Sequence, residues 1–117
     1  MGGKIPKRKT DKELYDLILR SIENVNYIIR QHAQDWLKER CINDLEVLNI
    51  LAGKKGRKRR RNENKEKYEA CYDDWNYCIE GVDVDGVNIR IIISFEGMKI
   101  MKMIIITVMR IVWWKRK

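Results

Sequence analysis

The sequence has few of the residues that build metal sites, disulfides and membrane spans. Its 117 residues include one histidine and three cysteines, and no two cysteines are spaced Cys-x-x-Cys. These residues cannot complete the usual ligand sets of structural zinc, so we expect neither a metal nor another cofactor. The cysteine count is odd and no apolar leader segment is visible, which favours free thiols in a reducing cytoplasm.

Long hydrophobic runs are also missing. The longest apolar stretch, Met103–Met109, is bounded by Lys102 and Arg110. Seven residues are too few to cross a bilayer, which needs about 20 in a helix. We therefore expect no membrane association and interpret this stretch as a buried strand.

Positive charge, by contrast, is abundant and concentrated. The net charge is +8, and residues 54–67 hold nine lysines and arginines against two glutamates. We expect this run to be a loop, because its like charges repel and it has no apolar period. Such a patch suits a polyanion, most often a nucleic acid, although it could be only a solvated loop. The candidate RNA contacts in it are Lys54, Lys55, Arg57, Lys58, Arg59, Arg60 and Arg61.

The N-terminal half carries helix signals. Thr10 and Glu13 form a capping box, in which each side chain binds the other residue's backbone amide. Asn43 and Glu46 repeat the capping pattern, and Gly53 suits the left-handed residue that ends a helix. We expect helices at 11–24, 31–40 and 44–51, a short extended link at 27–29, and a flexible basic arm at 1–10.

The C-terminal half switches to strand patterns, with candidate strands at 68–72, 77–84, 87–95 and 98–112. Asp85-Gly86 predicts a two-residue hairpin, and Glu96-Gly97 predicts a second one. The sequence therefore predicts an α+β domain over residues 11–112, with two to three N-terminal helices packed on one face of a roughly four-stranded antiparallel sheet. Residues 113–117 form an aromatic and basic tail, which could stack on RNA or pack on the sheet.

The two expected turns fix a register and so sort the side chains by face. They would pair Val84 with Val87 and Phe95 with Met98. The helix-covered face would then hold Ile89, Ile91, Ile93, Phe95, Ile100, Ile104, Ile106 and Val108. The open face would hold Tyr77, Asn88, Arg90, Ser94, Lys99, Met103 and Thr107, with Arg110 on the opposite side.

Several short motifs, taken in order, resemble a known family. They are His32-Ala33, Glu39-Arg40, Ile42, a helix ending at Gly53, Trp75 before a strand, Gly81, the strand Ile89–Ile93, and Ile106–Arg110. This order resembles bacterial proteins related to MqsR-like mRNA interferase toxins, of the RelE, barnase and colicin ribonuclease fold. The resemblance implies metal-independent RNA cleavage and a cognate antitoxin protein. The chain departs from the family pattern at Trp36, usually arginine, and at Cys41, usually glycine.

Metal-free RNA cleavage needs a proton carrier and a group that stabilises the phosphate. His32 is the candidate proton carrier, Arg90 the phosphate clamp, and Thr107 a residue that orients a phosphate oxygen. Tyr77 could stack on a base, and Arg110 is a further candidate RNA contact. Each has a structural alternative: His32 could simply bind backbone at a helix start, and Thr107 could be an ordinary strand residue.

Three functions follow from these patterns. The leading hypothesis is a toxin-like endoribonuclease that cleaves single-stranded RNA, such as mRNA, by metal-independent acid–base catalysis. The second is a nucleic-acid-binding protein of the same fold without activity, which the departure at Trp36 favours. The third is a protein-interaction module, because residues 69–85 contain six acidic residues and no lysine or arginine.

Overall fold

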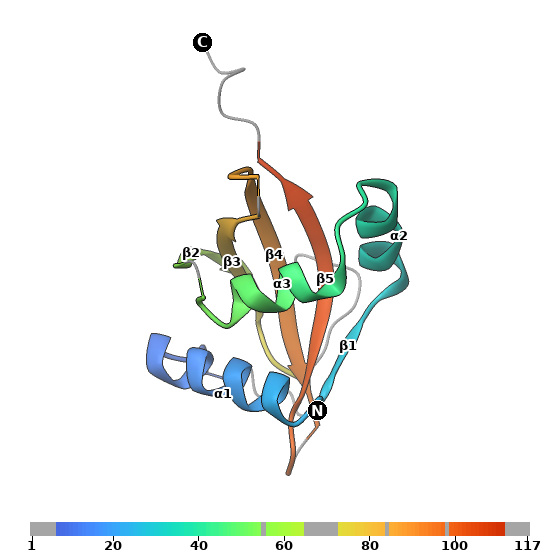
Figure 1. Ribbon diagram of the computed structural model, residues 1–117. Helices are drawn as coiled ribbons and strands as arrows, with labels where there is room; N and C mark the ends of the chain where they lie inside the picture. The colour runs from blue at the N-terminus through green and yellow to red at the C-terminus, as the bar shows by residue number, and fades with distance from the viewer. Residues whose placement is uncertain (1–6, 55, 65–72, 84, 98, 112–117) are drawn as a thin grey trace.

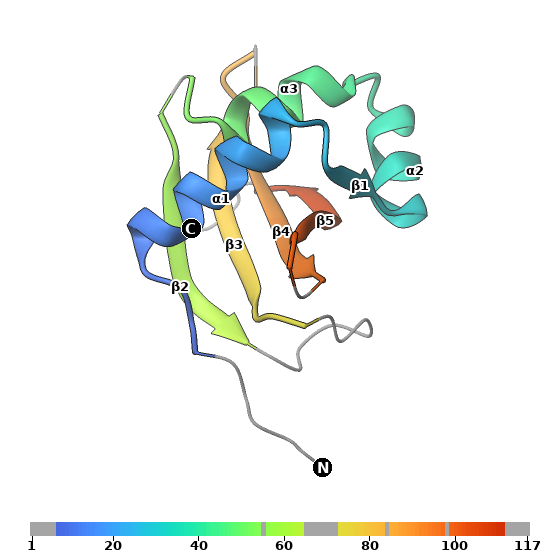
Figure 2. The same cartoon turned by 90° about the horizontal axis from the view of Figure 1, so that it is seen from below.

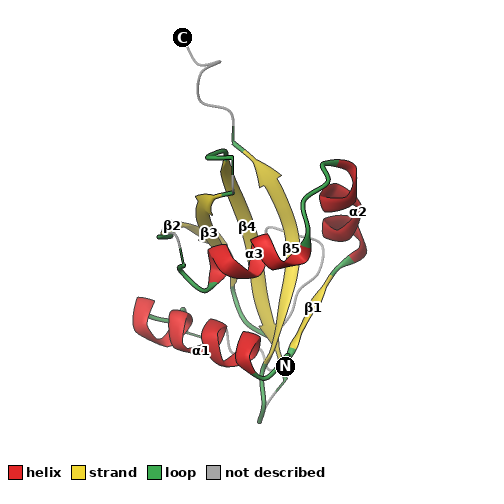
Figure 3. Cartoon of the chain, viewed as in Figure 1, coloured by secondary structure: helices red, strands yellow, loops and turns green. Residues whose placement is uncertain are grey.

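Three helices and a five-stranded mixed sheet make up the fold (Figures 1 and 3). The computed structural model describes residues 7–54, 56–64, 73–83, 85–97 and 99–111, and for 60–64 only the backbone. The sheet order is β1-β5-β4-β3-β2, with β1 parallel to β5 and the other pairs antiparallel. The elements in chain order are α1 (Asp11–Glu23), β1 (Tyr27–Ile29), α2 (Gln31–Glu39), α3 (Asp44–Leu51), β2 (Lys58–Asn64), β3 (Asn76–Val82), β4 (Asn88–Glu96) and β5 (Lys102–Arg110).

The helices begin where the capping patterns predict. Thr10 Oγ1 accepts from the Glu13 amide, and Glu13 accepts from the Thr10 amide at 2.9 Å. This hydrogen bond from the Thr10 backbone lowers the pKa of Glu13. Asn43 Oδ1 accepts from the Glu46 amide at 3.1 Å and starts α3. No helix among the described residues is both long enough and apolar enough to cross a membrane.

All three helices end in the same way. A residue in the left-handed region follows the helix, and its amide and the next amide donate to carbonyl oxygens of the last helical turn. The left-handed residues are Val25 (φ 51°), Cys41 (φ 56°) and Gly53 (φ 78°). Each of their amides bonds back into the last turn, and so does the amide of the next residue. This arrangement is the Schellman motif, which favours glycine because a side chain crowds the backbone there. Only α3 has the favoured residue.

Glycine at the other two helix ends is expected to stabilise the protein. The left-handed conformation strains a residue with a side chain by about 1–2 kcal/mol, and the β-branched Val25 is the less suited of the two. Glycine also loses more backbone entropy on folding, so Val25→Gly and Cys41→Gly should each raise the free energy of unfolding by about 0.5–1 kcal/mol. Urea denaturation measures this change. Val25→Ala is the control, since it removes the side chain but keeps the strain, and an equal gain there would contradict the explanation.

The sheet differs from the prediction in strand number and register. The link at 27–29 is a strand, β1, and the basic run is not a loop, since residues 58–64 form the edge strand β2. The expected strand at 68–72 lies outside the described residues. The connection between β3 and β4 is longer than two residues, because the Asp83 amide donates to Val87 O. Glu96 pairs with Lys102, so the next connection has five residues.

These longer connections move several side chains to the other face. Gly81 pairs with Ile89, and Phe95 pairs with Met103. Tyr77 and Met103 therefore belong to the main core beneath the helices, contrary to the prediction, while Ile104 and Ile106 lie on the second face. Around Cys78, Ile92, Ile104 and Ile106 the second face forms a small apolar cluster, so it is less polar than expected.

Close packing of α3 on β3 explains the glycine near the end of that strand. A Cβ added to Gly81 would lie 2.5 Å from Ile50 Cγ2, well inside van der Waals contact. Ile50 is itself a buried residue of the main core. Gly81 therefore lets the α3 helix approach the sheet.

Candidate nucleic-acid interface

Arg90, the expected phosphate clamp, is held by an ion pair on the second face of the sheet. It lies opposite Glu80 on β3, and its Nε and NH2 lie 2.9 and 2.8 Å from Glu80 Oε2. Both side chains are largely buried, with 24% of Arg90 and 11% of Glu80 exposed. An arginine held this way by a partly buried carboxylate is less available to a phosphate, because the carboxylate must be displaced first.

Thr107 shares this face with Arg90, as the sequence predicts, although through a different register. Thr107 pairs with Ile92, and Arg90 pairs with Met109 one step further along the same face. The register shifts between Ile92 and Ile93, so Ile106 is the extra residue of a β-bulge directly before Thr107. Bulges redirect side chains and recur near functional sites.

His32 lies on the first turn of α2 and is exposed. The buried residues of α2 are Ala33 and Leu37, which pack into the main core beneath the helices. Arg90 points to the other face of the sheet. The structure therefore brings Arg90 and Thr107 onto one face and leaves His32 on the helix-bearing side, so the three predicted catalytic residues do not form one cluster.

The two departures from the family pattern have visible roles, Trp36 within α2 and Cys41 just after it. Trp36 packs against the core, and the Arg40 guanidinium lies 4.4 Å from its ring centre, close enough for a cation–π contact. Arg40 NH1 also lies 3.2 Å from Glu39 Oε1. Cys41 occupies the left-handed position after the helix, where glycine fits best.

Two predicted RNA contacts are instead parts of the core. Arg59 is buried, and its NH1 lies 2.8 Å from Asp11 Oδ1 at the start of α1. Its guanidinium also lies 5.3 Å from the Tyr77 ring centre. Tyr77 has no exposed surface, and burial raises the pKa of its hydroxyl above the ordinary value. Both side chains are therefore engaged within the fold, and the Tyr77 ring presents no exposed surface on which a base could stack.

The remaining predicted contacts divide into three groups. Arg57 NH1 donates to Leu51 O at the end of α3, and its guanidinium stacks 3.8 Å from the Tyr15 ring centre, so this arginine caps a helix. Lys54 and Lys58 are exposed, as is Arg110 at the far end of β5. The predictions for Lys55, Arg60 and Arg61 concern side chains outside those described.

A buried carboxylate that sequence reasoning missed fastens the N-terminal arm. Asp74 Oδ1 accepts from the Tyr77 hydroxyl at 2.8 Å and from the Trp75 amide at 2.7 Å. Lys9 Nζ lies 3.0 Å from Asp74 Oδ2, and the Lys9 amide donates to the Tyr77 hydroxyl at 3.1 Å. The described end of the expected flexible arm is therefore docked. An aspartate three residues before a strand tyrosine was the only sequence signal.

The edge strand β2 contacts the start of α1, which directly follows the docked arm, although the two segments lie about fifty residues apart in the sequence. The Arg59–Asp11 ion pair holds β2 against the start of α1, and Figure 2 shows these segments side by side. Arg8 lies 5.5 Å from the ring centre of Trp75, which is half-buried. We define the basic edge as the exposed cations Lys7, Arg8, Lys54 and Lys58.

The acidic segment is engaged internally where it is described. Asp83 Oδ1 accepts from the Asp85 and Val87 amides, and Asp73 accepts from the Gly97 amide. Glu80 binds Arg90, and Asp74 binds the arm. These contacts account for the carboxylates of Asp73, Asp74, Glu80 and Asp83, and Asp85 is exposed.

Comparison with known proteins places the chain in a family. The family model described as Domain of unknown function (DUF4258) matches residues 29–110. The chain belongs to this family. The DUF4258 segment begins at the end of β1 and closes with the last residue of β5, so α1 and the basic arm lie outside it. Searches of curated proteins and of solved structures found no match.

Proposed function

We propose that this DUF4258 protein binds single-stranded RNA along the basic edge. The observation that carries the proposal is that two basic segments are both held on the fold: the Arg59–Asp11 ion pair joins β2 to the start of α1, and the Lys9–Asp74 ion pair docks the arm that precedes α1. Asp74, which is buried, and Asp11, which is exposed, pair with Lys9 and Arg59, whereas the cations of the basic edge remain exposed to solvent. A row of exposed cations attracts a phosphate backbone chiefly by releasing its counterions.

An aromatic residue beside the basic edge favours a single strand over a duplex. Trp75 is half-buried and has the Arg8 guanidinium over its ring. Unpaired bases stack on such aromatic surfaces with a gain of about 1–3 kcal/mol each, whereas paired bases are not accessible. The proposed surface therefore combines backbone attraction with one stacking position.

Removing two cations of the basic edge should weaken binding. Each phosphate contact on a single strand contributes about 0.7 to the slope of log K against log salt. We expect Lys54→Gln/Lys58→Gln to lower RNA affinity about tenfold at low salt and to reduce the slope by about 1.4. Fluorescence anisotropy of a labelled uridine-rich RNA over a salt series measures both values.

The matched control is Lys38→Gln/Lys102→Gln, which removes the same charge from α2 and β5. Both control residues are exposed and lie outside the basic edge. Equal weakening by the two double variants would mean that only net charge matters, and the proposed location would be wrong.

A second candidate function is metal-independent RNA cleavage, in which the exposed His32 would be the proton carrier. The Arg30 amide donates to Ile105 O at 3.0 Å, where β1 leaves β5. His32 and Thr107 each lie two residues beyond this bonded pair, and the bulge at Ile106 falls between it and Thr107. An exposed histidine with no bonded partner among the described residues can exchange protons with a bound strand. The resemblance to interferase toxins adds a cognate antitoxin protein to this candidate.

The RNA recovered after incubation with the protein distinguishes cleavage from binding alone. End-labelled RNA incubated with purified protein in EDTA should yield fragments that end in a 2′,3′-cyclic phosphate if the second candidate holds. His32→Gln should then stop cleavage while leaving RNA affinity unchanged. Intact RNA, or a His32→Gln protein that cleaves like the parent, would exclude this candidate and leave the binding proposal untouched.

A further inference from the structure

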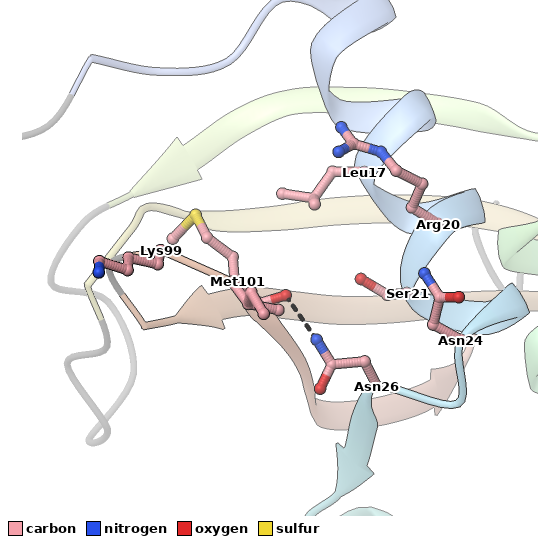
Figure 4. A pocket seen from close by; sticks show the side chains of 8 residues that line it. Leu17, Arg20, Ser21, Asn24, Asn26, Lys99 and Met101 are labelled. Atoms are coloured by element: carbon pink, nitrogen blue, oxygen red, sulfur yellow. Dashed lines mark hydrogen bonds between the residues drawn. The ribbon is translucent and has the colours of Figure 1, made fainter.

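A pocket lies between the C-terminal half of α1 and the connection from β4 to β5 (Figure 4). Its volume of about 470 Å³ falls within the range of small-molecule sites. Leu17, Arg20, Ser21 and Asn24 form the α1 wall, and Lys99 and Met101 form the opposite wall. The α1 wall lies outside the DUF4258 segment, so the pocket is an addition to that domain.

Hydrogen bonds at the base of the pocket hold the two walls together. Asn26 Nδ2 donates to Met101 O at 3.1 Å, and the Met103 amide donates to Asn26 O at 3.1 Å. The Asn26 amide in turn donates to Ser21 O at 2.7 Å. The connection itself is tight, because a Cβ on Gly97 would lie 2.5 Å from Ile100 O. The pocket is therefore preformed, and a ligand would lose little affinity in ordering it.

The lining is cationic and has one buried hydroxyl without a partner. Arg20 and Lys99 line opposite walls, no carboxylate lines the pocket, and neither cation has an ion-pair partner among the described residues. Ser21 is only 2% exposed, and its Oγ has no hydrogen-bond partner. Figure 4 shows that hydroxyl directed away from α1 toward the Met101 wall. A buried polar group without a partner is destabilising, which a ligand that binds it would relieve.

We propose that this pocket binds a nucleoside monophosphate unit. Arg20 would bind the phosphate, since charged donors make the strongest hydrogen bonds to phosphate oxygens. The Lys99 ammonium extends away from Arg20 in Figure 4 and would turn toward the phosphate on binding. Ser21 would bind a polar ligand atom, and the apolar surfaces of Leu17 and Met101 would contact the base. The C-terminal end of α1 has partial negative charge, which Arg20 in its last turn offsets. The unit is either a free nucleotide or the 5′-phosphorylated end of an RNA strand.

Binding of uridine 5′-monophosphate to the full-length protein, measured by isothermal titration calorimetry, tests the proposal. We expect uridine and inorganic phosphate to bind at least tenfold more weakly than the nucleotide, because each lacks one half of the contacts. Arg20→Gln and Lys99→Gln should each weaken nucleotide binding about tenfold. Lys12→Gln on the exposed first turn of α1 is the matched control and should bind as the parent does.

Ser21→Ala distinguishes a ligand contact from a structural role. Because the hydroxyl has no partner, its removal should leave the free protein at least as stable as the parent, while nucleotide affinity falls. Competition with a 5′-phosphorylated trinucleotide, and with its unphosphorylated form, shows which source the pocket accepts. Absence of nucleotide binding, or equal affinity in the parent, Arg20→Gln and Lys99→Gln proteins, would overturn the proposal. The basic-edge variants should leave nucleotide affinity unchanged, so this test fails or succeeds independently of the RNA-binding proposal.

Discussion

Asp74→Ala is expected to lower the free energy of unfolding by about 3 kcal/mol, because it removes the acceptor of a buried network. Only 3% of the Asp74 side chain is exposed, and its oxygens serve the Tyr77 hydroxyl, the Trp75 amide and the Lys9 ammonium. With alanine, the Tyr77 hydroxyl loses its acceptor inside the core. The arm also loses its ion pair, so RNA affinity should fall through the cations that the arm carries.

Asp74→Asn is the control for charge. Its carbonyl oxygen can still accept from Tyr77 and Trp75, so only the ion pair with Lys9 is lost. We expect about half the destabilisation of the alanine variant in urea denaturation. An alanine variant as stable as the parent would contradict the network, and equal losses in both variants would assign the whole effect to the ion pair.

Gly81→Ala is expected to lower the free energy of unfolding by about 2–3 kcal/mol, although it adds only one methyl group to a strand. The new Cβ would lie 2.5 Å from Ile50 Cγ2 on the packed face of α3, so the helix must move away from the sheet. Gly81 has no positive φ, so the expected loss is steric and not conformational.

A double-mutant cycle with Ile50→Ala tests this explanation. Ile50→Ala alone should cost about 2–4 kcal/mol by leaving a cavity. In the double variant the clash is absent, so its loss should be smaller than the sum of the single losses by at least about 1 kcal/mol. Strict additivity would show that Gly81 and Ile50 do not collide. Gly86→Ala should be destabilising for the opposite reason. A Cβ added at Gly86 would meet no atom within 4 Å, so only the positive φ of 81° disfavours alanine there.

The helices could be predicted because their signals are local. The capping pairs at Thr10 and Asn43 fix the starts of α1 and α3, and the prediction for α3 matches both its bounds. The register of the sheet was harder to predict, because it depends on the lengths of the connections between strands, and non-local packing sets those lengths. Asp83 caps a longer turn than Asp85-Gly86 alone suggests, and this difference moved Tyr77 to the other face. The five-residue connection after Glu96 did the same for Met103.

The candidate site was predicted in composition but not in arrangement. A run of like charges predicts a loop. The strand β2 forms nevertheless, because it pairs with β3 and because Asp11 provides a counter-charge to Arg59. Nothing in the local sequence shows that Asp11 and Arg59 meet. The shared face of Arg90 and Thr107 was predicted correctly, but the Glu80 partner depended on the true register.

The position of His32 limits what the family resemblance supports. The sequence motifs assigned catalytic roles to His32, Arg90 and Thr107 without placing His32 near Arg90, and in the structure α2, which carries His32, packs on the face of the sheet opposite to Arg90. Two other features of the resemblance gain physical reasons. Gly81 permits the approach of α3, and the position of Cys41 is one where a glycine is favoured by its positive φ.

Photo-crosslinking of a 4-thiouridine-labelled RNA, with the linked peptides identified by mass spectrometry, tests RNA binding at the basic edge most directly. We predict crosslinks in the peptides that contain Trp75 and Lys58, and their loss when salt is raised to 0.5 M. Crosslinks confined to peptides from α2 and β5, or no crosslinks at low salt, would contradict RNA binding at the basic edge.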